Sequence, residues 1–207
     1  MIAILDYGLG NLGSISNMLK VIGEKSLITS SKDDIQNADG IILPGVGAFD
    51  AGMQQLMDSG LVDVIKAYAA SGKPVLGICL GMQMLGRGSE EGTLKGLELI
   101  PFECRRFNFD NNSDLKIPHM GWDIVDIKKK HPLVSGLEGT QRYYFVHSYH
   151  AVCDNEENVL MTCDYGYEFA ASVVKDNVMG CQFHPEKSHD FGLALLSNFV
   201  QICREGV

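Results

Sequence analysis

In the first half of the chain, short runs of consecutive apolar residues alternate with longer segments whose apolar residues recur at helical spacing. The runs at 1–7, 26–29, 40–43 and 74–78 predict buried strands. The helical repeats at 12–22 and 53–68 predict one helix and then a helix or a pair of helices. The polar segment 30–34 predicts a plain loop. Strands that alternate with helices in this way are typical of parallel βα units.

Past residue 95 the apolar pattern changes to a period of two. The segments 97–107, 117–127 and 141–152 predict antiparallel or edge strands around a polar turn at 110–114. A hairpin is predicted from 167–175 and 177–183, and a closing helix from 191–203. The sheet is therefore predicted to be mixed. No repeat, linker or low-complexity segment marks a boundary, so we expect a single domain over residues 1–207.

Composition and charge narrow the possible classes of function. The 207 residues carry a formal net charge of -9, so the average surface would repel a nucleic-acid backbone. No apolar stretch reaches the 18 or so residues that would span a bilayer. The first apolar run meets Asp6 after five residues and has no basic leader, so we expect a core strand there and not a secretion signal. The six cysteines form no C-x-x-C pair, which favours reduced thiols over disulfides or a zinc site. We expect a cytoplasmic protein that binds neither membranes nor nucleic acid.

A glycine-rich turn follows the first predicted strand. Gly8, Gly10 and Gly13 have the G-x-G-x-x-G spacing of a dinucleotide-binding turn, with Asp33 twenty residues further on. The same spacing also occurs in any α/β protein whose first turn is tight. We prefer the second interpretation, a turn packed against the sheet edge or a partner, and keep a non-enzymatic dinucleotide binder as an alternative.

The sequence Gly77-Ile78-Cys79-Leu80-Gly81 follows a predicted strand and has the form of a nucleophile elbow. In such a turn the glycines remove side chains that would clash, and the central residue is exposed in strained geometry. A helix N-terminus and a neighbouring imidazolium would both favour a thiolate at Cys79. The N–H of Leu80 would be placed to donate to an oxyanion. The remaining five cysteines are interpreted as buried apolar fillers.

A thiolate nucleophile needs a base, and the base needs an orienting group. His184 and Glu186 are two residues apart, so in an extended segment both side chains would lie on one face, and Pro185 favours that backbone for His184. Cys79, His184 and Glu186 thus form a candidate triad. His131 and His189 are predicted at the surface, and His147 and His150 would not share a strand face, so no metal site is expected.

Together, the elbow at 77–83 (GICLGMQ) and the segment 183–186 (FHPE) resemble the class I, triad-type glutamine amidotransferases. Within them the chain is similar to the glutaminase subunits of imidazole glycerol phosphate synthases. That similarity rests on the segments 6–11, 44–49, 118–122, 144–149 and 184–188 and runs from end to end. The resemblance implies a three-layer α/β/α, flavodoxin-like fold with a central mixed, largely parallel sheet.

The same resemblance implies a reaction and a set of roles. Cys79 would attack the carboxamide of glutamine and His184 would protonate the leaving ammonia, with Glu186 behind it. The N–H groups of Val46 and Leu80 would hold the oxyanion, the first after a rearrangement of its loop. The glutamine would be held by Gly47, Gln83, Glu91 and Ser148. The ammonia would pass to a (βα)₈-barrel cyclase that contacts Trp122, Tyr144 and Lys187, and neither a cofactor nor a metal is implied.

Two positions depart from the family's pattern. Asp123 stands where asparagine is usual, and the segment 189–192 is not glycine-led. Both lie beside the segments expected to meet the partner. A paralogous glutaminase that feeds a sugar amidotransferase in surface-polysaccharide assembly is therefore kept as an alternative. A stand-alone hydrolase or peptidase of the same fold, active without any partner, is a further alternative.

Overall fold

The computed structural model describes residues 1–109 and 114–206. Most of the predicted polar turn at 110–114 lies outside the described residues. The first half forms β1 (Ile2–Leu5), α1 (Leu12–Ile22), β2 (Ser26–Thr29), α2 (Lys32–Asn37), β3 (Gly40–Leu43), α3 (Phe49–Asp58), α4 (Val62–Ala70), β4 (Val75–Ile78) and α5 (Leu80–Met84). The second half forms β5 (Phe102–Arg106), β6 (His119–Ile127), β7 (Gln141–His147), β8 (Tyr149–Cys153), β9 (Val159–Asp164), β10 (Glu168–Lys175), β11 (Val178–Cys181) and α6 (His189–Glu205). Short 3₁₀ helices form at Pro132–Val134, Glu156–Asn158 and Pro185–Lys187.

All of these strands belong to one mixed sheet, as predicted. Its main path runs β2-β1-β3-β4-β11-β10-β9-β6-β7, and β8 and β5 branch from β10. The pairings among β1, β2, β3, β4 and β11 are parallel. The pairings from β11 onward are antiparallel, so the antiparallel part is larger than the resemblance led us to expect.

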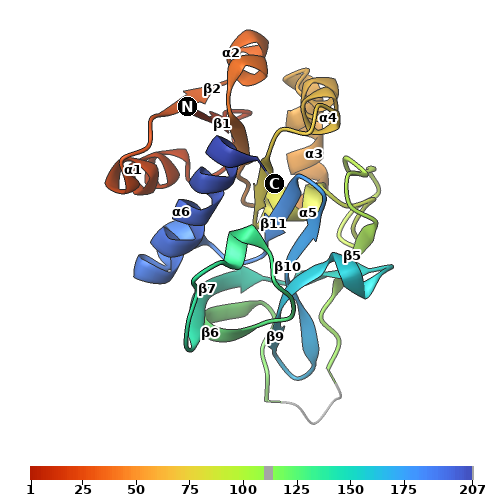
Figure 1. The fold of residues 1–207 in the computed structure, drawn as a ribbon. Coiled ribbons are helices and arrows are strands. Elements are labelled where there is room, and N and C mark those ends of the chain that lie inside the picture. The colour runs from red at the N-terminus through yellow and green to blue at the C-terminus, as the bar shows by residue number, and fades with distance from the viewer. Residues whose placement is uncertain (110–113, 207) are drawn as a thin grey trace.

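Helices cover both faces of the parallel part of the sheet (Figure 1). Alternate residues of β1 supply the two cores: Ile2 and Ile4 pack with α1 and α6 on one face. Ala3 and Leu5 pack with α2, α3 and α4 on the other. This alternation follows from the period of two along a strand, and it produces the expected three-layer α/β/α arrangement.

Several elements differ from the prediction. Residues 32–37 form a helix where a loop was expected, because Ser31 Oγ accepts a hydrogen bond from Asp34 N at 3.3 Å and caps the helix. The predicted strand 97–107 shortens to β5, and the predicted strand 141–152 breaks at Ser148 into β7 and β8. The strand β9 was not predicted. The hairpin β10–β11 and the closing helix α6 are confirmed.

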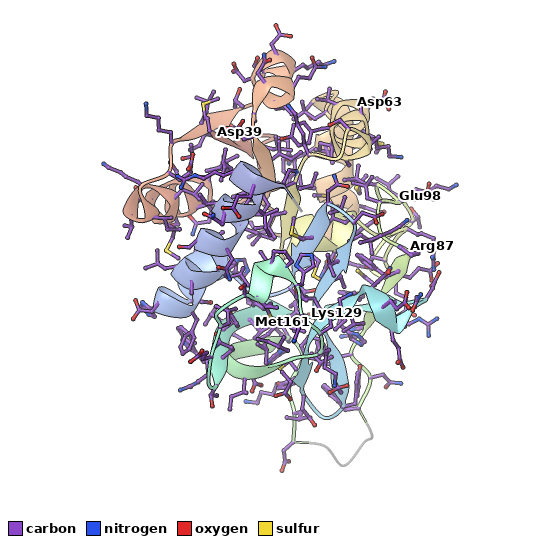
Figure 2. The ribbon with its side chains drawn as sticks, viewed as in Figure 1. Asp39, Asp63, Arg87, Glu98, Lys129 and Met161 are labelled. Atoms are coloured by element: carbon purple, nitrogen blue, oxygen red, sulfur yellow. The ribbon has the colours of Figure 1, made fainter. Side chains whose placement is uncertain are left out.

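Charged side chains lie mainly on the outside of the layers. Asp63 and Glu98 are exposed and point outward at the periphery, whereas Met161 on β9 is buried in the core (Figure 2). Within the described residues, no helix combines the length and apolar character needed to cross a membrane.

Candidate active site

The chain turns sharply at Cys79, between the buried strand β4 and the helix α5. The backbone of Cys79 has φ 54° and ψ -112°, a region that costs a non-glycine residue about 1–3 kcal/mol. The flanking glycines are required by the packing. A Cβ at Gly81 would lie 1.8 Å from the carbonyl oxygen of Leu43, and one at Gly77 would lie 2.8 Å from the backbone of Gly81. The geometry is that of the nucleophile elbow predicted from the sequence.

Leu80 is the first residue of α5, so its N–H precedes the hydrogen-bond ladder of the helix and is free for another acceptor. Gln182 donates from Nε2 to the sulfur of Cys79 at 3.8 Å, and its Oε1 accepts from Nε2 of Gln83 at 3.0 Å. Gln182 is fully buried and was missed in the sequence analysis. Its position two residues before His184 was the available signal, because residues two apart in an extended segment share a face.

His184 and Glu186 form the predicted pair. Nδ1 of His184 lies 2.8 Å from Oε1 of Glu186, and both side chains are almost completely buried. The backbone between them is a turn of 3₁₀ helix, so the expectation of an extended segment was wrong beyond His184 itself. The turn forms because Ser188 Oγ and Lys187 N both donate to the carbonyl of His184, at 2.6 and 3.0 Å.

The pKa of His184 is shifted by burial and by two neighbouring side chains. Burial lowers the pKa of His184, but attraction to Cys79 and Glu186 outweighs burial and raises the pKa to about 9. Nε2 of His184 is buried and meets no acceptor in hydrogen-bonding geometry among the described residues. Catalytic hydrogen bonds are often long before substrate binds, so this atom is available for the sulfur and the leaving group.

A cavity of about 310 Å³ opens over the elbow. It is lined by Val46, Gly47, Cys79, Leu80, Gln83, Glu91, Pro118, Val146, His147, Ser148, Tyr149 and His184. Every residue predicted to hold the oxyanion or the substrate is in this set, together with the nucleophile and the base. A larger cavity of about 960 Å³ lies between residues 127–137 and the end of α6, but it contains none of them. The smaller cavity is the candidate active site because the predicted nucleophile, base and substrate-binding residues line it.

Two of the predicted substrate-binding side chains also have structural partners. Nε2 of Gln83 donates to the carbonyl of Tyr149 at 3.1 Å as well as to Gln182, which leaves its Oε1 for a ligand. The exposed Glu91 accepts from the backbone N–H of Phe49 at 2.8 Å and so fixes the start of α3. One carboxylate oxygen is used in this way, and the cavity-facing part of the group can still meet a cation.

The loop at 44–47 packs against Tyr7 and the glycine-rich turn that follows it. The hydroxyl of Tyr7 donates to the carbonyl of Pro44. Gly10, at φ 108°, leaves room for the Pro44 ring, whose Cβ would lie 2.9 Å from a side chain at that position. The turn at 8–13 is therefore packed against the loop that carries Val46, in agreement with the preferred interpretation of this motif.

The histidines outside the pair have several environments. His189 is exposed, as predicted, but His131 is half-buried. The rings of His147 and His150 pack against the same Phe107 ring, because the chain breaks at Ser148 and the alternation of faces does not continue through it. Their nitrogens have separate partners: His147 contacts Tyr149 O and His119, and His150 contacts Tyr167 and Ala151 O.

The three residues expected at a partner interface gather on one surface. Trp122 and Tyr144 are cross-strand neighbours on β6 and β7, with ring centroids 6.4 Å apart. Lys187 Nζ lies 5.6 Å from the centroid of the Tyr144 ring. Alternation along β6 places Met120 and Ile124 beside Trp122, and all three are exposed. The carbonyl of Tyr144 accepts from the N–H of His184 at 2.9 Å, so this surface adjoins the predicted base.

Comparisons with known proteins give a consistent result. A model of the family "Glutamine amidotransferase class-I" matches residues 3–203. The "Imidazole glycerol phosphate synthase subunit HisH 2" of Pseudomonas aeruginosa is 51% identical over 98% of this chain and 100% of its own length. The "Imidazole glycerol phosphate synthase subunit HisH" of Methanosarcina acetivorans is 52% identical over 98% of each chain.

Solved structures agree in fold. A glutamine amidotransferase crystal structure superposes with a TM-score of 0.73 over 98% of each chain, at 18% identity. A glutamine amidotransferase from Thermotoga maritima gives a TM-score of 0.68 over 99% of this chain and 98% of that one, at 14% identity. These two similarities concern the fold alone.

Proposed function

Because the chain belongs to the class-I glutamine amidotransferase family, we propose that Cys79, His184 and Glu186 are the catalytic triad with which it hydrolyses glutamine. The chain is an enzyme, a glutaminase subunit of imidazole glycerol phosphate synthase in histidine biosynthesis, as the sequence motifs predicted. The observation that carries the assignment of the triad is the shared cavity. The strained Cys79 and the buried His184 both line it although they are 105 positions apart in the sequence, and Glu186 is paired with His184.

The reaction follows from the positions of these groups. The Cys79 sulfur attacks the side-chain carbonyl carbon of glutamine, and the oxyanion that forms is held by the N–H groups of Leu80 and Val46. His184 gives its Nε2 proton to the departing ammonia, and Glu186 keeps the imidazole oriented through Nδ1. Water then adds to the glutamyl thioester, His184 takes one of its protons, and glutamate leaves as the thiol is restored.

The substrate is held by the polar atoms on the cavity wall. Oε1 of Gln83 and the carboxylate of Glu91 suit the α-ammonium of glutamine, while Gly47 and Ser148 suit its α-carboxylate. Val46 is 40% exposed on the loop over the elbow, so this loop can change its backbone without disturbing the core. A loop of this kind would switch the second oxyanion donor and hence the rate.

Glutaminase activity can be tested with a diazoketone analogue of glutamine and mass mapping of the adduct. Cys79 is the expected site, and labelling of another cysteine would overturn the triad. Cys181 is the matched control, because it is fully buried on β11 next to the elbow, where its carbonyl accepts from the N–H of Cys79, and burial raises its pKa well above the usual range. The variant His184→Gln should fold and react much more slowly.

The enzyme is a subunit of a complex, and its partner is proposed to be a (βα)₈-barrel cyclase that uses the released ammonia. Support comes from the surface formed by the exposed Trp122, the half-buried Tyr144 and the exposed Lys187, since aromatic residues are enriched at interfaces. Trp122→Ala should weaken binding of the cyclase at least tenfold and reduce the stimulation of glutaminase activity. High turnover without the cyclase would favour a stand-alone hydrolase instead.

Complementation of a histidine auxotroph that lacks the glutaminase subunit tests the pathway in cells. Growth is the expected result, and failure with a folded, active protein would favour the polysaccharide role. We also propose a single domain over 1–207, because both cores lie on the faces of one sheet. A cytoplasmic location is proposed because the cysteines of the described chain are free thiols.

A further inference from the structure

Three ligand-type side chains that the glutaminase reaction does not use meet on β6 and β9. Nε2 of His119, a carboxylate oxygen of Asp123 and Sγ of Cys163 all lie within 4.8 Å of one another. His119 and Asp123 are four residues apart on β6, and Cys163 on β9 faces Val125 across the strand pair, so all three side chains lie on one face of the sheet. His119 and Cys163 are almost fully buried, and Asp123 is half-buried.

The His119 ring is fixed before any ligand arrives. It is stacked between Tyr165, at a centroid distance of 4.0 Å, and Phe145, at 4.8 Å. Its Nδ1 lies 3.2 Å from Nε2 of His147, and its Nε2 lies 3.3 Å from Oδ2 of Asp123. Both nitrogens therefore have defined directions, with Nε2 aimed at the carboxylate.

The hydrogen-bond chain determines which nitrogen of His119 carries the proton. The carbonyl of Tyr149 can only accept, so Nδ1 of His147, 2.8 Å away, is the donor. A neutral His147 that donates through Nδ1 has only Nε2 left to accept, so Nδ1 of His119, 3.2 Å away, can donate to it. Nε2 of a neutral His119 then presents its lone pair toward Asp123, which is the orientation that a metal-binding imidazole needs.

We propose that His119, Asp123 and Cys163 bind one divalent cation of the zinc class. Imidazole, carboxylate and thiolate are all ligands that zinc takes, whereas magnesium and calcium require oxygen ligands. Ligands of a tetrahedral zinc ion are about 3.3 to 3.8 Å apart, so the group must contract by about 1 Å at most. The hydrogen bond from Nδ1 of His119 is the outer contact that zinc-binding histidines usually make.

The remaining coordination position is open. Gly121 lies between His119 and Asp123 on β6, and a Cβ there would meet nothing within 4 Å. A water molecule can occupy this side and complete four ligands. Zinc-class ions bind cysteine as the thiolate, so binding must release the thiol proton of Cys163 to solvent, and affinity should rise with pH. The ion would tie β6 to β9 directly behind the exposed face of Trp122.

No sequence motif points to this site, because Cys163 is 40 residues beyond Asp123 and lies on a strand that was not predicted. The proposal is independent of the glutaminase triad. None of its three ligands lines the catalytic cavity, and its test measures bound metal and not turnover.

The test is a titration of the reduced full-length chain with Co²⁺, which occupies zinc sites and absorbs through its thiolate bond. Wild type should show a thiolate-to-cobalt charge-transfer band that saturates at one equivalent, and zinc should abolish it by displacement. Cys163→Ser should lose the band. Cys153→Ser is the matched control and should keep it, since Cys153 has a carboxylate neighbour, Asp154, but belongs to no such ligand group in the described chain.

Asp123→Asn keeps the shape of the side chain, so it tests the site even if Cys163→Ser unfolds. We expect it to weaken Co²⁺ binding at least tenfold and to lose the rise in melting temperature that zinc gives wild type. Cys79→Ala should retain the band. Absence of the band in wild type, or an equal band in Cys163→Ser, would overturn the proposal.

Discussion

Replacing Gly81 with alanine tests how tightly the elbow is packed. A Cβ at this position would lie 1.8 Å from the carbonyl oxygen of Leu43 and 2.8 Å from its carbonyl carbon. Real Cβ contacts stay at 3.0 Å or beyond, so the end of β3 or the elbow must move by about 1.2 Å. Both clashing atoms belong to the backbone of a fully buried residue, and no side-chain rotation can relieve them.

The expected cost follows from this displacement. Overpacking of a well-filled interior costs about 1–3 kcal/mol, and a backbone clash of this size should fall at the upper end. The oxyanion loop at 44–47 follows Leu43 directly, so the shift also moves Val46 relative to Cys79. A misplacement of about 1 Å in a catalytic group can reduce the rate about 100-fold.

Urea unfolding and glutaminase kcat/KM of Gly81→Ala check both expectations. Gly13→Ala is the control. Gly13 lies in α1 with no atom within 4 Å of an added Cβ, so this variant should be as stable as wild type or up to about 1 kcal/mol more stable. If Gly81→Ala unfolded at the same urea concentration as Gly13→Ala and kept its activity, the inference that the elbow is closely packed would be wrong.

Three further outcomes are expected. Cys79 and Glu186 raise the pKa of His184 from 6.5 to about 9, against the effect of burial, so the stability that this shift contributes is complete below pH 6.5 and is lost as pH rises through 9. The urea midpoints of wild type and His184→Gln should therefore converge over this range. A difference between the midpoints that stays constant with pH would contradict this expectation. Tyr7→Phe leaves the buried carbonyl of Pro44 without its donor and should lower the free energy of unfolding in urea by about 1–3 kcal/mol. An unchanged urea midpoint would show that this hydrogen bond does not stabilise the loop. Glu91→Gln should raise KM for glutamine about tenfold with a smaller change in kcat, and an unchanged KM would remove Glu91 from the substrate site.

Residues that act through local geometry could be predicted from the sequence. Gly77 and Gly81 had to be glycines because the strand-to-helix turn brings backbone against backbone: a Cβ at Gly81 would meet Leu43, and a Cβ at Gly77 would meet Gly81 itself. His184 and Glu186 are two positions apart, so their contact needed only a short segment of chain. The turn between them is helical and not extended, because Ser188 closes it from outside the motif.

Elements whose cause lies elsewhere in the chain were missed. The helix at 32–37 depends on a cap from Ser31, and β9 forms because β6 and β10 pair with its two edges. Gln182 became visible only when β11 placed it beside the sulfur of Cys79. For β9 and Gln182 a partner distant in the sequence overrides the weak local preference, whereas the Ser31 cap is a local signal that the sequence analysis overlooked.

From the sequence alone the candidate nucleophile, its candidate base and the family could be predicted, since steric demands at a tight turn and the spacing of two side chains are local properties. Tertiary structure decided which polar groups share a cavity and how the oxyanion loop rests on the turn at 8–13. It also decided that His119 and Asp123 meet Cys163 across two strands. These juxtapositions depend on the order and register of the strands in the sheet. That order is set by the burial of the two opposite faces of the sheet, which is a property of the whole chain.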